Sequence, residues 1–291
     1  MIAAALIGLG EVGLVLGEDL AARPLTAWDT AFAAPHSPAS RHAQALGLDP
    51  AVEATTVVAG ATVVISAVTA ANTVAAARSC APGLRPGTWY LDLNSSSPAL
   101  KQAAARVIAD AGGRYVEAAV MSPIQPTRLA APILLGGPDA AGFAEIADSL
   151  GFTGTEVYAD TIGPAAATKL CRSVVVKGLE ALLTESMLAA RAWGVEKRVL
   201  DSLSNMVPAA DWPTLAAYMM SRSLEHGTRR AEEMREAART VEETGVTPWM
   251  ATATVERQDW AAAFRAHSAP DDLVAMLDAV RAEISDGEAK A

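Results

Sequence analysis

The chain has 291 residues, 51% hydrophobic and 19% charged, a composition typical of globular rather than disordered proteins. Its 33 acidic against 23 basic residues give a net charge of −10, which opposes binding to nucleic-acid phosphates. Two cysteines without a CxxC pair and four scattered histidines argue against a disulfide framework and a zinc site, so we expect no metal.

One uncharged stretch, residues 54–77, is long enough to suggest a membrane span. It contains several Ser, Thr and Asn residues and divides into a β-branched run and an alanine-rich helix, so we expect no membrane association. The apolar start lacks the basic segment of a signal peptide and runs directly into a glycine motif. We therefore expect a soluble, cytoplasmic protein.

Strand and helix patterns alternate over the first 160 residues. The expected strands are Ile2–Ile7, Leu25–Trp28, Val63–Val68, Trp89–Leu93, Tyr115–Val120, Ile133–Leu135 and Glu156–Tyr158. The expected helices include Val12–Ala22, Ala70–Arg78, Ala99–Ala111 and Ala140–Leu150. This alternation predicts an α/β fold with a Rossmann-type, doubly wound, mainly parallel sheet.

The pattern becomes entirely helical near Gly163. One long, alanine-rich helix is expected from Pro164 to about Ala192. Further helices are expected at Glu196–Met206, Trp212–Leu224, Arg229–Thr244, Thr252–Ala266 and Asp271–Ile284. We therefore expect a Rossmann domain over residues 1–162 and an all-α C-terminal domain for substrate binding and dimerisation over residues 163–291. Because the long helix is apolar nearly all round, we expect a homodimer through this domain.

A dinucleotide-binding motif follows the first strand. Gly8, Leu9, Gly10, Glu11, Val12 and Gly13 match G-x-G-x-x-G and open a helix, and Asp29 ends the next strand. The three glycines permit a tight turn, a close approach of the pyrophosphate and close helix–strand packing. The Asp29 carboxylate would accept hydrogen bonds from ribose hydroxyls and repel a 2′-phosphate. No Lys or Arg follows it before Arg41, so we expect NAD in preference to NADP.

Four later segments, together with this motif, resemble the β-hydroxyacid dehydrogenases, the family of 3-hydroxyisobutyrate and 6-phosphogluconate dehydrogenases. They are Val68-Thr69, residues 92–98 (DLNSSSP), residues 117–123 (EAAVMSP) and Gly163 with Lys169. The resemblance implies that Val68 and Thr69 contact the cofactor and that Lys169 is catalytic. The family's substrate-loop serine aligns with Met121, one place before Ser122, and its asparagine after the lysine is replaced by Ser173.

The expected chemistry centres on Lys169, which would exchange the alcohol proton while a hydride moves between substrate carbon and nicotinamide. Arg172 and Ser173 lie three and four residues later and share its helix face. We expect Ser173 and Ser122 to assist catalysis and Arg172 to clamp an anionic substrate. Asn94, which would contact the cofactor, and Ser95 and Ser96, which would contact the substrate, follow a strand end.

A basic cluster of His226, Arg229 and Arg230 near an expected helix start is assigned to substrate binding, in place of the family's second lysine. These residues predict an oxidoreductase for a small anionic hydroxy acid, or the matching oxo acid or semialdehyde. Two alternatives stay open: an imine reductase on the same scaffold, which the presence of Lys169 argues against, and a dinucleotide-binding protein without catalysis.

Overall fold

The computed structural model describes residues 2–204 and 211–288. By internal packing the chain divides into two compact units, Met1–Leu170 and Cys171–Ala291. In the described residues no helix is long and apolar enough to cross a membrane, and none of their acidic, His or Cys side chains form a group suited to a metal ion. The part of the expected helix Glu196–Met206 beyond Ser204 lies outside the described residues.

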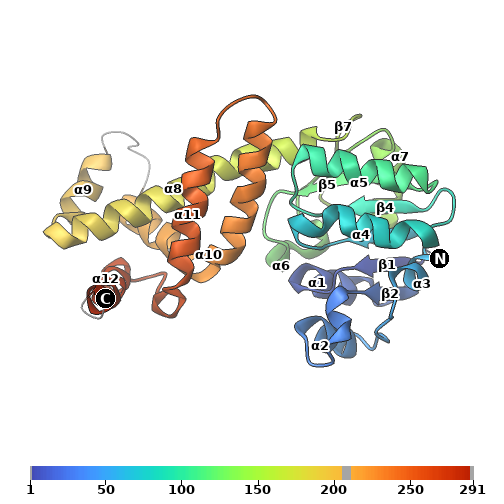
Figure 1. Ribbon diagram of the computed structural model, residues 1–291, viewed down its shortest axis with the longest axis horizontal. Coiled ribbons are helices and arrows are strands. Elements are labelled where there is room, and N and C mark those ends of the chain that lie inside the picture. The colour runs from blue at the N-terminus through green and yellow to red at the C-terminus, as the bar shows by residue number, and fades with distance from the viewer. Residues whose placement is uncertain (1, 205–210, 289–291) are drawn as a thin grey trace. The chain divides into compact units, whose positions relative to one another are not determined.

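The first unit is built on one seven-stranded sheet in the order β2-β1-β3-β4-β5-β6-β7 (Figure 1). The strands are β1 (Ala4–Ile7), β2 (Leu25–Trp28), β3 (Val63–Ser66), β4 (Trp89–Asp92), β5 (Arg114–Val120), β6 (Ile133–Gly136) and β7 (Thr155–Ala159). All neighbouring strands are parallel except β5 and β6. The predicted doubly wound, mainly parallel sheet is confirmed.

Helices cover both faces of this sheet. They are α1 (Glu11–Leu20), α2 (Pro38–Ala45), α3 (Ala54–Val58), α4 (Thr73–Cys80), α5 (Pro98–Asp110), α6 (Ile124–Thr127) and α7 (Ala140–Leu150). Alternate strand residues point to opposite faces: Leu6 packs in the core that α1 and α7 cover, and Ile7 in the core that α3, α4 and α5 cover. β1 and β3 are neighbours although β2 lies between them in sequence, so the strand order reverses there, at the usual ligand position of such sheets.

The second unit is helical in its described residues. The long helix α8 (Pro164–Trp193), which begins in the first unit, confirms the prediction for this segment (Figure 1). It is followed by α9 (Glu196–Leu203), α10 (Trp212–Glu242), α11 (Trp249–Ala262) and α12 (Leu273–Glu288). Their apolar faces form one core, with Met187, Met220 and Leu277 at its centre.

The two helices expected at Trp212–Leu224 and Arg229–Thr244 form a single helix, α10, so this prediction was wrong. Gly227 lies between the two expected helices, and it is the point at which α10 packs closely on α11. A Cβ atom at Gly227 would lie 2.4 Å from the carbonyl oxygen of Gln258 and 2.8 Å from the amide nitrogen of Ala262. The basic cluster therefore lies in the middle of a helix and not at its start.

Candidate functional site

The glycine-rich turn lies where the strand order reverses. Gly8 has a φ of +92°, and a Cβ there would lie 2.5 Å from the Ala67 carbonyl oxygen just after β3. A Cβ at Gly13 would lie 2.2 Å from the carbonyl oxygen of Gly8, so α1 packs directly on the turn. Gly10 differs: it is exposed, and no atom lies within 4 Å of the place its Cβ would take. This open surface at a helix N-terminus fits a pyrophosphate.

The peptide at Leu9 is held on both sides. Its amide donates to Asp29 Oδ2 at 2.8 Å, and its carbonyl oxygen lies 2.8 Å from Nδ1 of His42 on α2. The other oxygen of Asp29, Oδ1, accepts the amide of Ala31 at 2.8 Å. Both carboxylate oxygens of Asp29 therefore accept backbone amides, and the side chain shapes this turn. Glu11 and Val12 follow in the first turn of α1, with Glu11 exposed.

Asn94 links the carboxyl ends of β3 and β4. Its Oδ1 accepts the amide of Val68 at 2.7 Å, and its Nδ2 donates to Ser66 Oγ at 3.1 Å. Asn94 is 4% exposed, so its side chain supports the Val68-Thr69 turn from beneath. Val68, Thr69 and Asn94 thus form one connected edge beside the glycine-rich turn.

Lys169 reaches the same edge of the sheet. Its Nζ donates to Ser95 Oγ at 2.7 Å, across 74 residues of sequence. Both residues belong to the first unit, so this contact is internal to it. The neighbouring Ser96 is fully buried and its Oγ has no hydrogen-bond partner. Ser97 caps α5, and its Oγ accepts the amide of Leu100 at 3.5 Å. The structure thus brings together Lys169 and Ser95 of the predicted site.

The start of α8 is anchored by Glu117 on β5. Its Oε2 accepts the amide of Gly163 and its Oε1 accepts the amide of Ala166, both at 2.6 Å. These amides belong to the first turn of the helix, where no backbone acceptor is available and negative charge is favourable. Glu117 is fully buried, so the carboxylate fixes the helix that carries Lys169 to the centre of the sheet.

Ser122 has no strong partner. Its Oγ lies 3.4 Å from Pro123 O and 3.4 Å from Thr127 Oγ1, long distances for hydroxyl hydrogen bonds. Arg128, a few residues later, has a φ of +52° and binds both Glu18 and Asp19 at 2.8 Å. The segment after β5 is thus tied to α1, and the hydroxyl of Ser122 remains available for a ligand.

In the second unit, Ser173 is engaged by a lysine the sequence analysis did not single out. Ser173 is 5% exposed and its Oγ accepts from Lys177 Nζ at 3.0 Å. Lys177 also pairs with Glu233 on α10 at 2.6 Å. Arg172, one residue before Ser173, is exposed on α8. Of this pair, Arg172 has the greater freedom to meet a substrate.

The three basic residues assigned on α10 have different surroundings. Arg229 is exposed, whereas Arg230 is 8% exposed and pairs with Glu180 on α8 at 2.8 Å. Burial and the charge of Arg222 lower the pKa of His226, and His226 Nε2 lies 2.6 Å from Nη1 of Arg222. The neutral imidazole therefore accepts from the guanidinium, and Arg230 is committed to an ion pair.

Burial raises the pKa of Glu180 to about 7, outweighing the opposite effects of Arg230 and Lys177. The folded chain therefore holds the Glu180 proton more tightly than the unfolded chain does. This stabilises the fold at pH values below the ordinary pKa of a glutamate, and the stabilisation is lost as the pH rises toward 7. We expect the free energy of unfolding of the wild type to fall by up to ~3 kcal/mol between about pH 4.5 and 7, relative to Glu180→Gln. Urea titrations at several pH values, with the exposed Glu232→Gln as control, measure it. If the unfolding free energies of the wild type and of Glu180→Gln change in parallel with pH, the raised pKa of Glu180 is contradicted.

Four supporting residues were not identified as such from the sequence: His42, Lys101, Glu117 and Lys177. Each is a single charged or polar residue that binds a residue at least nine positions away, and only Lys177 also has a nearby partner, Ser173 four residues earlier, so local spacing does not reveal these roles. Glu117 gave the only usable signal, because it is an acid inside an otherwise apolar strand. An isolated charge in a buried strand requires a partner.

Residues 3–163 match the family described as the NAD binding domain of 6-phosphogluconate dehydrogenase. This match covers more than half of the 291 residues. The chain belongs to the β-hydroxyacid dehydrogenase family. Residues 190–261 match a second family, a domain of unknown function designated DUF1932. The chain therefore carries the dinucleotide-binding domain of a family of oxidoreductases.

Solved structures show the same fold over nearly the whole chain. A conserved hypothetical protein from Sinorhizobium meliloti 1021 is 37% identical, with a TM-score of 0.74 and 96% of each chain covered. The conserved protein MTH1747, of unknown function and structurally similar to 3-hydroxyacid dehydrogenases, is 29% identical, with a TM-score of 0.67 and coverage of 89% of this chain and 96% of that chain. The 3-hydroxyisobutyrate dehydrogenase of Mycobacterium tuberculosis, solved with L-serine, is 19% identical, with a TM-score of 0.71 and coverage of 97% and 99%.

A curated relative shares a shorter region. The cytokine-like nuclear factor N-PAC of Xenopus tropicalis is 27% identical over 124 residues, which is 42% of this chain and 23% of that protein's length. This similarity concerns one region of a much longer protein.

Proposed function

We propose that the chain is an NAD-dependent dehydrogenase or reductase for a small anionic hydroxy acid, or for the matching oxo acid or semialdehyde. The observation that carries this proposal is the contact of Lys169 Nζ with Ser95 Oγ, 2.7 Å long, at the edge of the sheet where the glycine-rich turn lies. An amine held at a ligand-binding edge suits proton transfer to and from a substrate oxygen.

The dinucleotide, when bound, supplies the nicotinamide ring that exchanges the hydride. The residues of this chain do the rest. The open surface over Gly10 receives the pyrophosphate, and Val68, Thr69 and Asn94 line the adjoining edge. Lys169 accepts the hydroxyl proton in the oxidative direction and returns it in the reductive direction. In the second unit, the exposed Arg172 and Arg229 offer guanidinium groups for an anionic substrate.

The experiment that tests this function measures NADH and NADPH turnover with a panel of small hydroxy and oxo acids, including phosphorylated and phosphonate compounds. We expect turnover of at least one oxo acid or semialdehyde. Turnover of cyclic imines alone would favour the imine reductase. NADH binding without turnover of any compound would favour a dinucleotide-binding protein without catalysis.

Asp29 is expected to set the preference for NAD. A carboxylate beside the ribose repels a 2′-phosphate, so Asp29→Asn should bind NADPH more tightly relative to NADH. Asp29→Ala should weaken both, because it also releases the Leu9 amide. Fluorescence titration with NADH and NADPH measures these affinities, and Asp49→Asn, an exposed acid of the same unit, is the control. Tenfold tighter binding of NADPH by the wild type, about 1.4 kcal/mol, would show that this assignment is wrong.

A stripe along α8 supports a homodimer. Val175 is 71% exposed, Leu182 57% and Trp193 83%, although all three are large apolar residues. The steps from Val175 to Leu182 and from Leu182 to Trp193 are seven and eleven residues, which keep them on one side of the helix. A second copy of the same stripe, related by a two-fold axis, would cover it.

The α8 stripe should therefore determine the oligomeric state. We expect Leu182→Arg to convert a dimer into a monomer of 30.0 kDa. Val52→Arg, which replaces a more exposed apolar residue in the first unit, should remain dimeric. Sedimentation at micromolar concentration distinguishes the two masses. A wild type that is already a stable monomer would rule out this interface.

A further inference from the structure

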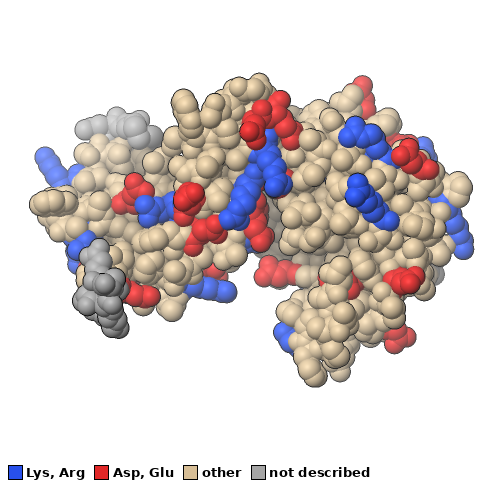
Figure 2. Space-filling model, viewed as in Figure 1, with Lys and Arg blue, Asp and Glu red and all other residues tan. Residues whose placement is uncertain are grey.

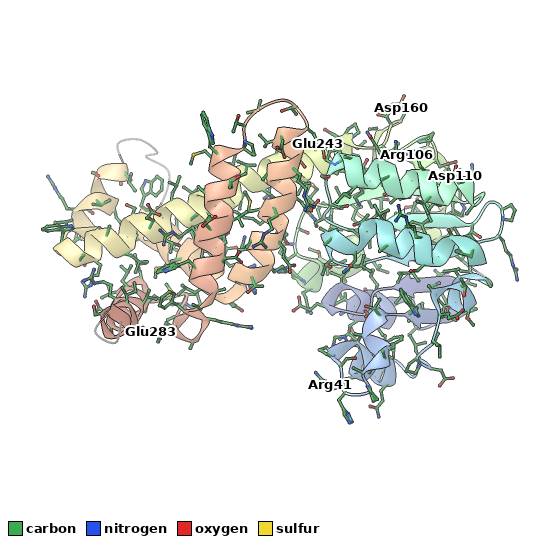
Figure 3. All side chains as sticks on the ribbon, viewed as in Figure 1. Arg41, Arg106, Asp110, Asp160, Glu243 and Glu283 are labelled. Carbon is green, nitrogen blue, oxygen red and sulfur yellow. The ribbon has the colours of Figure 1, made fainter. Side chains whose placement is uncertain are left out.

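Lys101 is a buried lysine beneath the turn that carries Asn94 and Ser95. It lies in the first turn of α5 and is 1% exposed. Figure 3 shows that Arg106 and Asp110, further along the same helix, project from its outer side. Acidic and basic side chains are interspersed over the visible surface in Figure 2, where they remain hydrated. Lys101 is buried away from water, so its charge requires hydrogen-bond or ion-pair partners within the protein.

Its contacts are all with one residue. Lys101 Nζ donates to the backbone oxygen of Asp92 and to Asp92 Oδ1, both at 2.9 Å. Asp92 Oδ1 also accepts the amide of Asn94 at 2.8 Å, and Asp92 Oδ2 accepts from the hydroxyl of Tyr115 at 2.6 Å. Asp92 is fully buried at the end of β4, and the Tyr115 ring stacks on Tyr90 at 5.9 Å. Each Asp92 acceptor is thus fixed by a side chain or amide with little freedom to move.

This ion pair closes a loop that begins at Asp92 and ends at Lys101. Within the loop, Asn94 holds the Val68 amide and Ser95 meets the Lys169 amine. A buried ion pair is weak evidence for stability, because apolar residues of similar volume often stabilise a fold equally well. The loop contains three predicted site residues, Asn94, Ser95 and Ser96, so positioning of the site explains the Asp92–Lys101 pair better than stability does.

We propose that Lys101 is a positioning residue: through Asp92 it fixes the turn at residues 93–97, so that Ser95 meets Lys169 and Asn94 supports the Val68 edge. The roles of Asn94 and Lys169 rest on the proposed function. The positions of their atoms do not, so this inference can be tested in the protein without substrate.

The test measures trace acetylation of individual lysines by acetic anhydride, read by mass spectrometry. The hydrogen bond to Ser95 Oγ restrains the amine of Lys169, which must leave this bond to attack the anhydride, so Ser95→Ala should increase its labelling rate by about tenfold. We expect Lys101→Met to increase labelling of Lys169 in the same direction, and to weaken NADH binding about tenfold, since small displacements of a site have effects of this size or larger. The exposed Lys197 serves as the internal reference.

Arg114→Met is the matched control, since it breaks the exposed Arg114–Asp139 pair elsewhere on the first unit. It should change neither readout. If Lys101→Met does not fold, the variant with both Asp92→Asn and Lys101→Met removes the two charges together and is measured instead. A folded variant with unchanged Lys169 labelling and unchanged NADH affinity overturns the proposal. Wild type that fails to bind NADH would contradict the proposed function, and the labelling comparison alone would then decide the role of Lys101.

Discussion

Lys169→Ala is expected to lower kcat by about 10²–10⁴-fold, the usual contribution of general acid–base catalysis. Cofactor affinity should change little, because the glycine-rich turn is held by Asp29 and His42 and not by Lys169. Lys169→Arg should not restore turnover, since a guanidinium does not release its proton at working pH. Steady-state kinetics with the substrate found in the panel, and a fluorescence titration with NADH, measure both quantities.

Two further variants show whether the effect is specific to Lys169. Lys197→Ala removes an exposed lysine of α9 and should leave kcat unchanged. Arg172→Ala should instead raise KM for an anionic substrate with little change in kcat, because a charge clamp acts on ground state and transition state alike. A Lys169→Ala enzyme with near wild-type kcat would remove the proposed mechanism.

Glu117→Ala is expected to lower the free energy of unfolding by roughly 2–4 kcal/mol. The change leaves the amides of Gly163 and Ala166 buried without their acceptors, at about 1–3 kcal/mol for each such group. Turnover should fall as well, because these amides fix the helix that carries Lys169. Thermal and urea unfolding followed by circular dichroism measure the loss of stability.

The control for Glu117 is Glu156→Ala, which removes an exposed glutamate from β7 of the same sheet. Its unfolding curve should overlay that of the wild type. The stability of Glu117→Gln should lie between that of the wild type and that of Glu117→Ala. Its side-chain amide keeps one acceptor oxygen but turns an N–H group toward one of the helix amides. Stability of Glu117→Ala equal to that of Glu156→Ala would show that the carboxylate does not anchor α8.

The sheet and the long helix were predictable because their signals are local. Short apolar runs between alanine-rich stretches indicate βαβ units, and the glycine spacing identifies the turn at Gly8. The continuity of α10 was not predictable in this way. Gly227 suggests a break in the sequence, but its missing side chain allows the backbones of α10 and α11 to approach each other. Tertiary packing here outweighs the low helix propensity of glycine.

The site was predictable only where a motif defined it. Lys169 and Ser95 were both predicted, and the structure shows that they meet. The sequence analysis assigned Arg230 to substrate binding and Ser173 to catalysis. In the structure Arg230 pairs with Glu180, and Ser173 accepts a hydrogen bond from Lys177. Nothing in the spacing of these residues specifies which partner a long charged side chain selects, because the partners lie on different helices.

The central claim is that this chain moves a hydride between a dinucleotide and a small anionic substrate. It is tested most directly by incubating the protein with NADH deuterated at C4 of the nicotinamide, on the face that is transferred, and with the oxo acid panel. The account predicts that mass spectrometry finds one deuterium on the carbinol carbon of a hydroxy acid product, and that Lys169→Ala forms this product far more slowly. NADH binding by the wild type without deuterium in any product would contradict the account.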